Sequence, residues 1–164
     1  MSKIKPCLWF NGHAEEAAKF YVALFGDAAI GDVSRYGEGA PFAAGTALMV
    51  EFTLFGQHYQ ALNGGPQYAH SEAISLSVAC RDQAEADHYW QALTAHGGTE
   101  SMCGWCKDRW GVSWQIVPDG LAALLTDPDS GRRERAMAAM MGMKKLDLAA
   151  MRAAADLVEA EGGA

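Results

Sequence analysis

The sequence predicts an α+β fold made of two copies of a strand–helix–three-strand (βαβββ) module, followed by C-terminal helices. Three observations predict it: an internal repeat at a spacing of about 70 residues, alternating apolar residues on both sides of each repeated helix, and a tail rich in Ala and Met. One module cannot close its sheet alone. We therefore expect the paired modules to form a curved mixed sheet with helices outside and a central cleft.

The repeat pairs the stretch WFNGHAEEAAKFYVALFGD with VACRDQAEADHYWQALTAHGG. Each stretch begins like a strand and then places Asn11 or Asp82 where a helix cap belongs. Asp82 and Glu85 have the spacing of a capping box. Each helix carries an aromatic pair followed by Ala-Leu, and each is expected to end at a glycine, Gly26 or Gly97.

The remaining strands follow from alternation and turn residues. In the first module a Gly- and Ala-rich loop over 37–45 separates two strands, and Gly56-Gln57 is expected to form a hairpin turn. The expected strands of this module are 28–36, 46–55 and 58–62. Those of the second module are 73–80, 99–105 and 113–117, with a further short strand around 107–110.

The predicted domain organisation is a body over residues 1–128, with modules at about 3–63 and 72–118, and a helical extension over 129–164. In the extension, Gly142 divides two helices and Asp147 lies near the start of the second. The methionines there form an adaptable apolar surface, which favours packing against the body or a partner subunit over a cofactor box. They are Met137, Met140, Met141 and Met143.

Charge and hydropathy exclude several classes of function. A formal net charge of −7 and a pI of about 5.1 argue against a nucleic-acid-binding protein, which needs a basic face. No run of eighteen apolar residues is present, so no membrane span is expected. The N-terminus lacks the length of a signal peptide, which predicts a cytoplasmic protein with reduced thiols.

Several motifs, in order, resemble a known family. They are PCLWFNGHAEEAAKFY, FTLFGQHYQALNGGP, ISLSVACRDQAEADHYW, DRWGVSWQIVP and AMAAMMGMKKLDLAAMRAA. The chain is similar to the PhnB-like family, also labelled 3-demethylubiquinone-9 3-methyltransferase, in the vicinal oxygen chelate superfamily of glyoxalases, extradiol dioxygenases and bleomycin-resistance proteins. The resemblance covers nearly the whole chain and implies the duplicated fold. It also implies a homodimer, for which the apolar tail surface is suited.

The resemblance implies metal ligands as well, because metal-dependent members place His and Glu on inward positions of four strands. Here the matching positions are Lys5, Gln60, Ser75 and Gln115. A cation, two amides and a hydroxyl bind divalent metals poorly compared with imidazole or carboxylate. We therefore expect neither a metal nor another cofactor. No glycine-rich nucleotide motif follows a strand into a helix, which argues against a methyltransferase cofactor site.

The ligand-binding candidates are polar or aromatic residues that alternation places toward the cleft. Asn63 belongs to a loop that rims the cleft, and Trp114 replaces Gln115 if the last strand slips by one residue. The candidates are Cys7, Trp9, His58, Gln60, Asn63, Ser75, Ser77, Trp114 and Gln115. They predict a protein that binds a small molecule through amides, hydroxyls and indoles.

The one candidate for a catalytic role is Glu51, which alternates with Met49 and Thr53. If it faces the cleft, burial would raise its pKa and make it an acid/base group. The alternative to metal-free binding of a small molecule is a metal-dependent lyase, isomerase or dioxygenase that uses His58 or Glu51. A third hypothesis is that the tail binds a partner protein. The spacing Cys103-Gly-Trp-Cys106 is redox-like, but its place in a strand or hairpin favours structural thiols.

Overall fold

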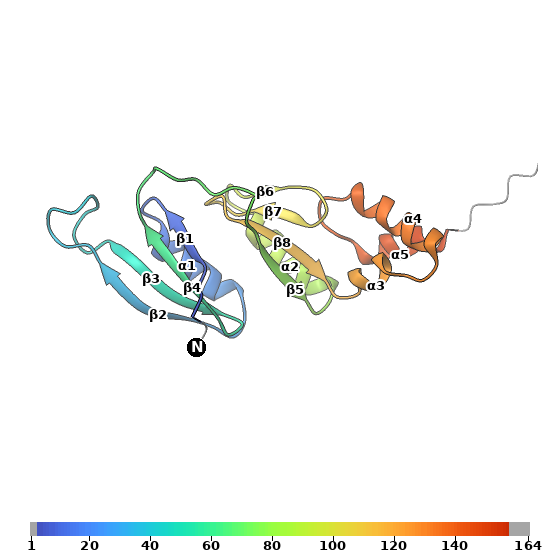
Figure 1. Cartoon of the computed structure of the whole chain (residues 1–164), viewed down its shortest axis with the longest axis horizontal. Helices are drawn as coiled ribbons and strands as arrows, with labels where there is room; N and C mark the ends of the chain where they lie inside the picture. Colours follow the sequence, from blue (N-terminus) through green and yellow to red (C-terminus); the bar gives the residue numbers. More distant parts are fainter. Residues whose placement is uncertain (1–2, 158–164) are drawn as a thin grey trace, which may run out of the picture. The chain divides into compact units, whose positions relative to one another are not determined.

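The computed structural model describes residues 3–157. They divide into two compact units, which we call unit 1 (up to Ser71) and unit 2 (from Glu72). Each unit contains a four-stranded mixed sheet with one helix packed on one of its faces (Figure 1). The predicted α+β class, with two βαβββ modules and C-terminal helices, is confirmed.

Unit 1 consists of β1 (Cys7–Phe10), α1 (Ala14–Leu24), β2 (Ala28–Arg35), β3 (Ala47–Leu54) and β4 (Gln57–Asn63). The strand order is β1-β4-β3-β2, in which β1 and β4 are parallel and the other pairs antiparallel. Helix α1 covers one face of this sheet (Figure 1). The side chains buried there include Leu8, Val50, Phe52 and Ala61. Because neighbours along a strand point to opposite faces, the residues between them lie on the other, open face.

Unit 2 repeats this arrangement with β5 (Leu76–Cys80), α2 (Gln83–Thr94), β6 (Thr99–Glu100), β7 (Trp105–Lys107) and β8 (Ser113–Pro118). The order β5-β8-β7-β6 is that of unit 1, and again only the first pair is parallel among the described strands. The chain continues into α3 (Leu121–Leu125), α4 (Ser130–Met141) and α5 (Leu148–Asp156), which pack together around Met151.

The strand register shows which single positions of unit 1 and unit 2 are equivalent. In unit 1, Gln60 is paired with Cys7 on one side and Glu51 on the other. In unit 2, Gln115 is paired with Ser77 and Trp105 in the same way. Gln60 and Gln115 are therefore equivalent, and so are Glu51 and Trp105.

The helix starts differ from the sequence prediction in unit 1. Asp82 caps α2 as predicted, since its Oδ1 accepts from the backbone N–H of Glu85 at 2.8 Å. The prediction of Asn11 as a cap is wrong: α1 begins after His13, which makes no side-chain cap bond. The backbone N–H of Ala14 instead donates to Oδ1 of Asn63, 49 residues away. A tertiary contact thus replaces the local cap.

One predicted turn and one predicted strand differ in the structure, and positive φ values explain both differences. The β3–β4 hairpin turns at Phe55-Gly56, where φ is 48° and 74°, rather than at Gly56-Gln57. Two successive residues with positive φ are what a two-residue hairpin that follows the strand twist requires. The predicted strand over 99–105 is interrupted, because Cys103 and Gly104 also have positive φ and turn the chain between β6 and β7.

The tail follows the prediction at two points. Gly142 ends α4, and Asp147 begins α5 with its Oδ1 accepting from the N–H of Ala150. Helix α3 is an element that the sequence reasoning missed. Within unit 2, the loop after α4 is bound to the turn between β6 and β7 by two backbone hydrogen bonds, from Cys103 N to Met143 O at 2.8 Å and from Gly104 N to Lys144 O at 2.7 Å. None of the helices within residues 3–157 has the length and apolar character needed to cross a bilayer.

Candidate functional site: the open sheet faces

The open face of the unit 1 sheet carries most of the residues that the sequence singled out. Cys7 is exposed there, and Trp9, Glu51, His58 and Gln60 are half-buried. They come from β1, β3 and β4, at positions that alternate with the buried core residues. The strand alternation assumed from the sequence therefore has the correct register in this unit.

A charged network lies at the centre of this face. The Lys5 ammonium donates to Oε2 of Glu51 at 2.7 Å, and Nε2 of Gln60 donates to Oε1 of Glu51 at 3.1 Å. The Lys5 hydrogen bond, followed by that from Gln60, holds the pKa of the Glu51 carboxyl below its ordinary value of 4.5. The expected rise of this pKa through burial is wrong, because the Lys5 cation outweighs desolvation. Glu51 is thus an ionised hydrogen-bond acceptor at neutral pH.

Lys5→Met is expected to raise the pKa of Glu51. In the native protein this lowered pKa means that the ion pair contributes to stability above the carboxyl's unfolded pKa, and that the contribution is lost as the pH falls through the folded pKa. An NMR titration of the Glu51 carboxyl carbon would measure the change. Lys3→Met removes the same charge two residues earlier and should leave this pKa where it was. Equal titration curves for both variants would contradict the assignment.

Trp9 is held on the same face by three contacts. Its Nε1 donates to the carbonyl of Gly65 at 2.8 Å, and its ring meets Tyr68 edge to face with centroids 5.0 Å apart. Gly64 lies against the indole so closely that an added Cβ would come within 2.2 Å of the ring. The tryptophan is therefore a positioned apolar wall rather than a freely rotating surface side chain.

A shallow pocket of about 200 Å³ lies beside this network, toward strand β2. His58 and Glu51 line it together with Asp32 and Thr53. Gly31 allows β2 to pass close to Glu51, whose carbonyl oxygen would lie 3.3 Å from a Cβ at that position. This pocket is one concave part of the open face of unit 1.

The open face of unit 2 presents a different set of groups at the equivalent positions. Nε2 of Gln115 donates to Oγ of Ser75 at 2.8 Å, and Ser77 is exposed beside them. Trp105 occupies the position equivalent to Glu51. Each of the two glutamines thus donates from its amide nitrogen to a side chain of its own unit, Gln60 to Glu51 and Gln115 to Ser75.

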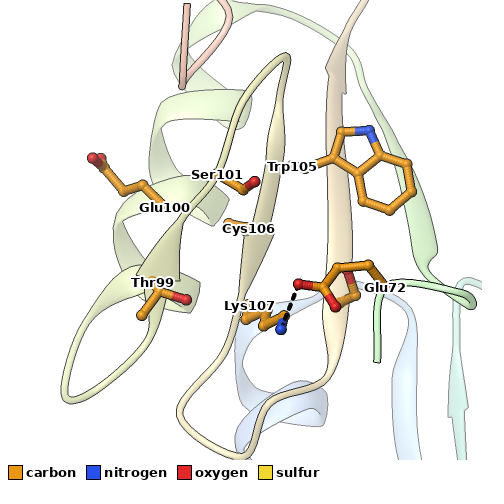
Figure 2. A pocket seen from close by; sticks show the side chains of 8 residues that line it. Glu72, Thr99, Glu100, Ser101, Trp105, Cys106 and Lys107 are labelled. Carbon is orange, nitrogen blue, oxygen red and sulfur yellow. Dashed lines mark ion pairs between the residues drawn. The ribbon is translucent and has the colours of Figure 1, made fainter. Parts of the chain in front are cut away.

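A second pocket, of about 160 Å³, is lined by Trp105, Lys107 and Glu72 of unit 2, with Ser101 and Ser113. Figure 2 shows the Lys107 ammonium and the Glu72 carboxylate pointing toward one another, and they lie 2.6 Å apart. The ion pair lowers the pKa of Glu72. Lys107 is therefore neutralised within the unit.

Two of the sequence candidates lie in the core instead of on an open face. Trp114 is 1% exposed, and its Nε1 donates to Oδ2 of the buried Asp108 at 2.9 Å. Asn63 is also 1% exposed; its Oδ1 accepts from Ala14 N, and its Nδ2 donates to the Ala47 carbonyl at 2.8 Å. The strand register in unit 2 is thus the one that turns Gln115 outward, and both buried residues have structural roles.

The arrangement of the cysteines does not favour a reactive pair. Burial raises the pKa of the Cys106 thiol to about 12 and that of Cys80 to about 11. Cys103 is half-buried in the turn before β7, where its backbone is left-handed. A redox pair needs a stabilised thiolate, commonly at a helix N-terminus, so Cys103 and Cys106 do not fit that chemistry.

The residues present do not fit the divalent metal that the resemblance implies. Lys5 stands at one of the four matching positions as a cation bound to Glu51, and the other three positions hold neutral side chains. Within residues 3–157, no three His, Cys, Asp or Glu side chains lie close enough together to hold a metal ion. These positions therefore do not supply the ligands that metal-dependent chemistry requires.

Sequence reasoning missed three contributors to these faces. Trp105 and Lys107 were missed because the predicted strand ran unbroken from 99 to 105, which obscured the alternation around the buried Cys106. Glu72 precedes β5 and has no periodicity to reveal it. Lys5 was identified as a matching position, but its pairing with Glu51 spans 46 residues and has no local signal.

Comparisons with known proteins found several solved structures that are similar to this chain. A PhnB protein from Bacillus cereus that carries the 3-demethylubiquinone-9 3-methyltransferase name is 34% identical, covering 71% of this chain and 99% of that one, with a TM-score of 0.67. A Staphylococcus aureus protein is 32% identical over 73% of this chain and 98% of its own, with a TM-score of 0.34. A Pseudomonas aeruginosa protein, 23% identical over 73% of this chain and all (100%) of its own, shares the fold with a TM-score of 0.58.

No curated protein matches the chain. The family model described as 3-demethylubiquinone-9 3-methyltransferase matches residues 2–117, which span both βαβββ modules and stop before the helical tail. The family resemblance found in the sequence motifs is thereby confirmed, and the chain belongs to the 3-demethylubiquinone-9 3-methyltransferase family of PhnB-like proteins.

Proposed function

We propose that this protein binds a small organic molecule on the open sheet face of unit 1, without a metal ion. The observation that supports the proposal most directly is the network of Lys5, Glu51 and Gln60. It occupies the region where a metal-dependent relative would carry His and Glu ligands, and it satisfies the Glu51 carboxylate with protein donors. Such a network is built for hydrogen bonding rather than for chelation.

The surroundings suit a small ligand with an apolar part. Ligand sites combine apolar and aromatic walls with a few placed polar groups. Trp9 and Leu62 supply the apolar area beside the network, and the pocket next to Glu51 has a volume of about 200 Å³. This volume is below the roughly 300–1,000 Å³ of drug-sized sites, so we infer a compact ligand.

The methyl transfer in the family's name has no support from the local structure. A dinucleotide-type cofactor site needs a glycine-rich turn between a strand and a helix. Here the turn after β1 reads Asn11-Gly12-His13 and the turn after β5 reads Arg81-Asp82. Neither is glycine-rich, so these two turns do not form a nucleotide site of that kind.

Elemental analysis together with a thermal-shift screen tests the proposal. We expect Ni, Zn, Fe and Mn to be well below one ion per chain, and the melting temperature to be unchanged by a chelator. Compounds that bind the folded state should raise the melting temperature with or without added metal. One bound metal ion per chain, or a large loss of stability in chelator, would instead favour a metal-dependent lyase, isomerase or dioxygenase.

A further inference from the structure

We propose that Gln60 offers its amide oxygen to the ligand, so that the open face of unit 1 selects molecules that carry a hydrogen-bond donor, such as an N–H or hydroxyl group. The inference rests on the proposed function, because it names the class of ligand that the same face accepts. It follows from which end of the Gln60 amide Glu51 already uses.

The orientation of the Gln60 side chain is dictated by its partner. An ionised carboxylate can only accept hydrogen bonds, whereas a glutamine amide has a donor end and an acceptor end. Glu51 accepts from Lys5 through Oε2 and from Gln60 through Oε1, the latter at 3.1 Å. Reversing the amide would place two acceptor oxygens against each other at this distance. The nitrogen of Gln60 is therefore committed to Glu51.

The amide oxygen of Gln60 is left for another partner. Within residues 3–157, no hydrogen bond to this oxygen is found, and the side chain is half-buried. A ligand that covers Gln60 removes water from the oxygen and must replace the lost hydrogen bond with a donor of its own. A ligand without one leaves a desolvated acceptor unpaired, which lowers affinity by about tenfold or more.

Lys5 further narrows the class of ligands that this face accepts. Its ammonium has three N–H groups, of which Glu51 accepts one. A primary amide or an alcohol can accept from Lys5 and donate to Gln60 at the same time. An ether, a ketone or a tertiary amide can only accept. The network therefore distinguishes ligands of nearly equal size by whether they carry a donor.

The equivalent glutamine of unit 2 provides an internal contrast. Gln115 is bound to the hydroxyl of Ser75, with Nε2 and Oγ 2.8 Å apart. A hydroxyl can donate as well as accept, so it imposes no direction on the amide. Selection for donors is thus a property of Gln60 and not of Gln115.

The test uses the full chain and three inert probes: benzamide, N-methylbenzamide and N,N-dimethylbenzamide. They keep the same ring and carbonyl and carry two, one and no N–H donors. We expect affinity, measured by NMR titration, to fall at least about tenfold from the first probe to the third. Chemical-shift changes should centre on Gln60 and Trp9.

Three variants separate hydrogen bonding from size. In Glu51→Gln the neighbour can donate, so Gln60 is free to turn and the ratio of affinities should shrink to about threefold or less. Gln60→Met should shrink it to the same extent, while any steric cost of the added methyl groups remains. Gln115→Met is the matched control and should retain the full ratio. Amide spectra would establish that each variant is folded.

The outcomes distinguish this inference from the proposed function. If the probes bind on the unit 1 face with equal affinity, or if Glu51→Gln keeps the full ratio, the selection rule is wrong and the binding function stands. If none of the probes binds and the thermal-shift screen also yields no ligand, both are overturned.

Discussion

Asp108→Ala is expected to lower the free energy of unfolding of unit 2 by about 3–5 kcal/mol. The Asp108 side chain is 3% exposed, and both of its carboxylate oxygens accept hydrogen bonds. Its Oδ1 accepts from the backbone N–H groups of Trp110 and Val112, both at 3.0 Å, and its Oδ2 accepts from Trp114 Nε1 at 2.9 Å. Alanine would remove the Asp108 acceptor from two donors in the core, the Val112 N–H and the Trp114 indole N–H.

Urea denaturation would measure the loss, and hydrogen exchange along β8 would show that it occurs in unit 2. Asp108→Asn should lie between alanine and the native protein, because an amide can still accept at one end but places a donor against the Trp114 indole. Asp119→Ala, at an exposed aspartate of the same unit, is the control and should change stability by less than about 0.5 kcal/mol. A loss below about 1 kcal/mol for Asp108→Ala would contradict the role of this residue.

Asn63→Ala is expected to lower the free energy of unfolding of unit 1 by about 3 kcal/mol. The substitution leaves the Ala14 N–H, at the start of α1, and the Ala47 carbonyl, at the start of β3, without their partner. Both groups lie in the core, so water does not compensate for the lost hydrogen bonds. Ligand affinity of the folded fraction should stay unchanged, because the side chain does not reach the open face.

Asn11→Ala is the matched control, because Asn11 is the exposed asparagine that the sequence suggested as the cap of α1. We expect it to change the free energy of unfolding by less than about 0.5 kcal/mol. Asn63→Asp should retain the bond to Ala14 N but set a carboxylate against the Ala47 carbonyl, and so fall between the two. Equal stability losses for Asn11→Ala and Asn63→Ala would mean that the tertiary cap is not the one that holds α1.

The periodic features of the sequence were enough to predict the architecture. Strand-like apolar runs such as "CLWF" and "ALMVEFTL" and the repeated cap–aromatic–glycine pattern identified both modules and both helices. The alternation of faces along a strand placed Cys7, Gln60 and Gln115 on open faces. These predictions succeed because strand and helix periodicity is a local property, decided by which side chains avoid water.

Local patterns could not choose between residues of similar chemistry. Trp114 and Gln115 are adjacent, and alternation alone permits either to point outward. Burial of the indole against Asp108 decided it, since that acceptor satisfies the indole N–H inside the core. For the same reason Asn63, and not Asn11, accepts the hydrogen bond from the first turn of α1. The folded sheet brings Asn63 to the start of the helix.

By itself the sequence determined the fold class, the duplication, the family and the absence of strong metal ligands at the matching positions. Only the tertiary structure decided the chemical state of the candidate site. Glu51 is an ionised acceptor with a lowered pKa because Lys5, 46 residues away in the chain, lies 2.7 Å from it. Electrostatic and hydrogen-bond energies depend on distance in space, and residue spacing along a chain does not specify that distance.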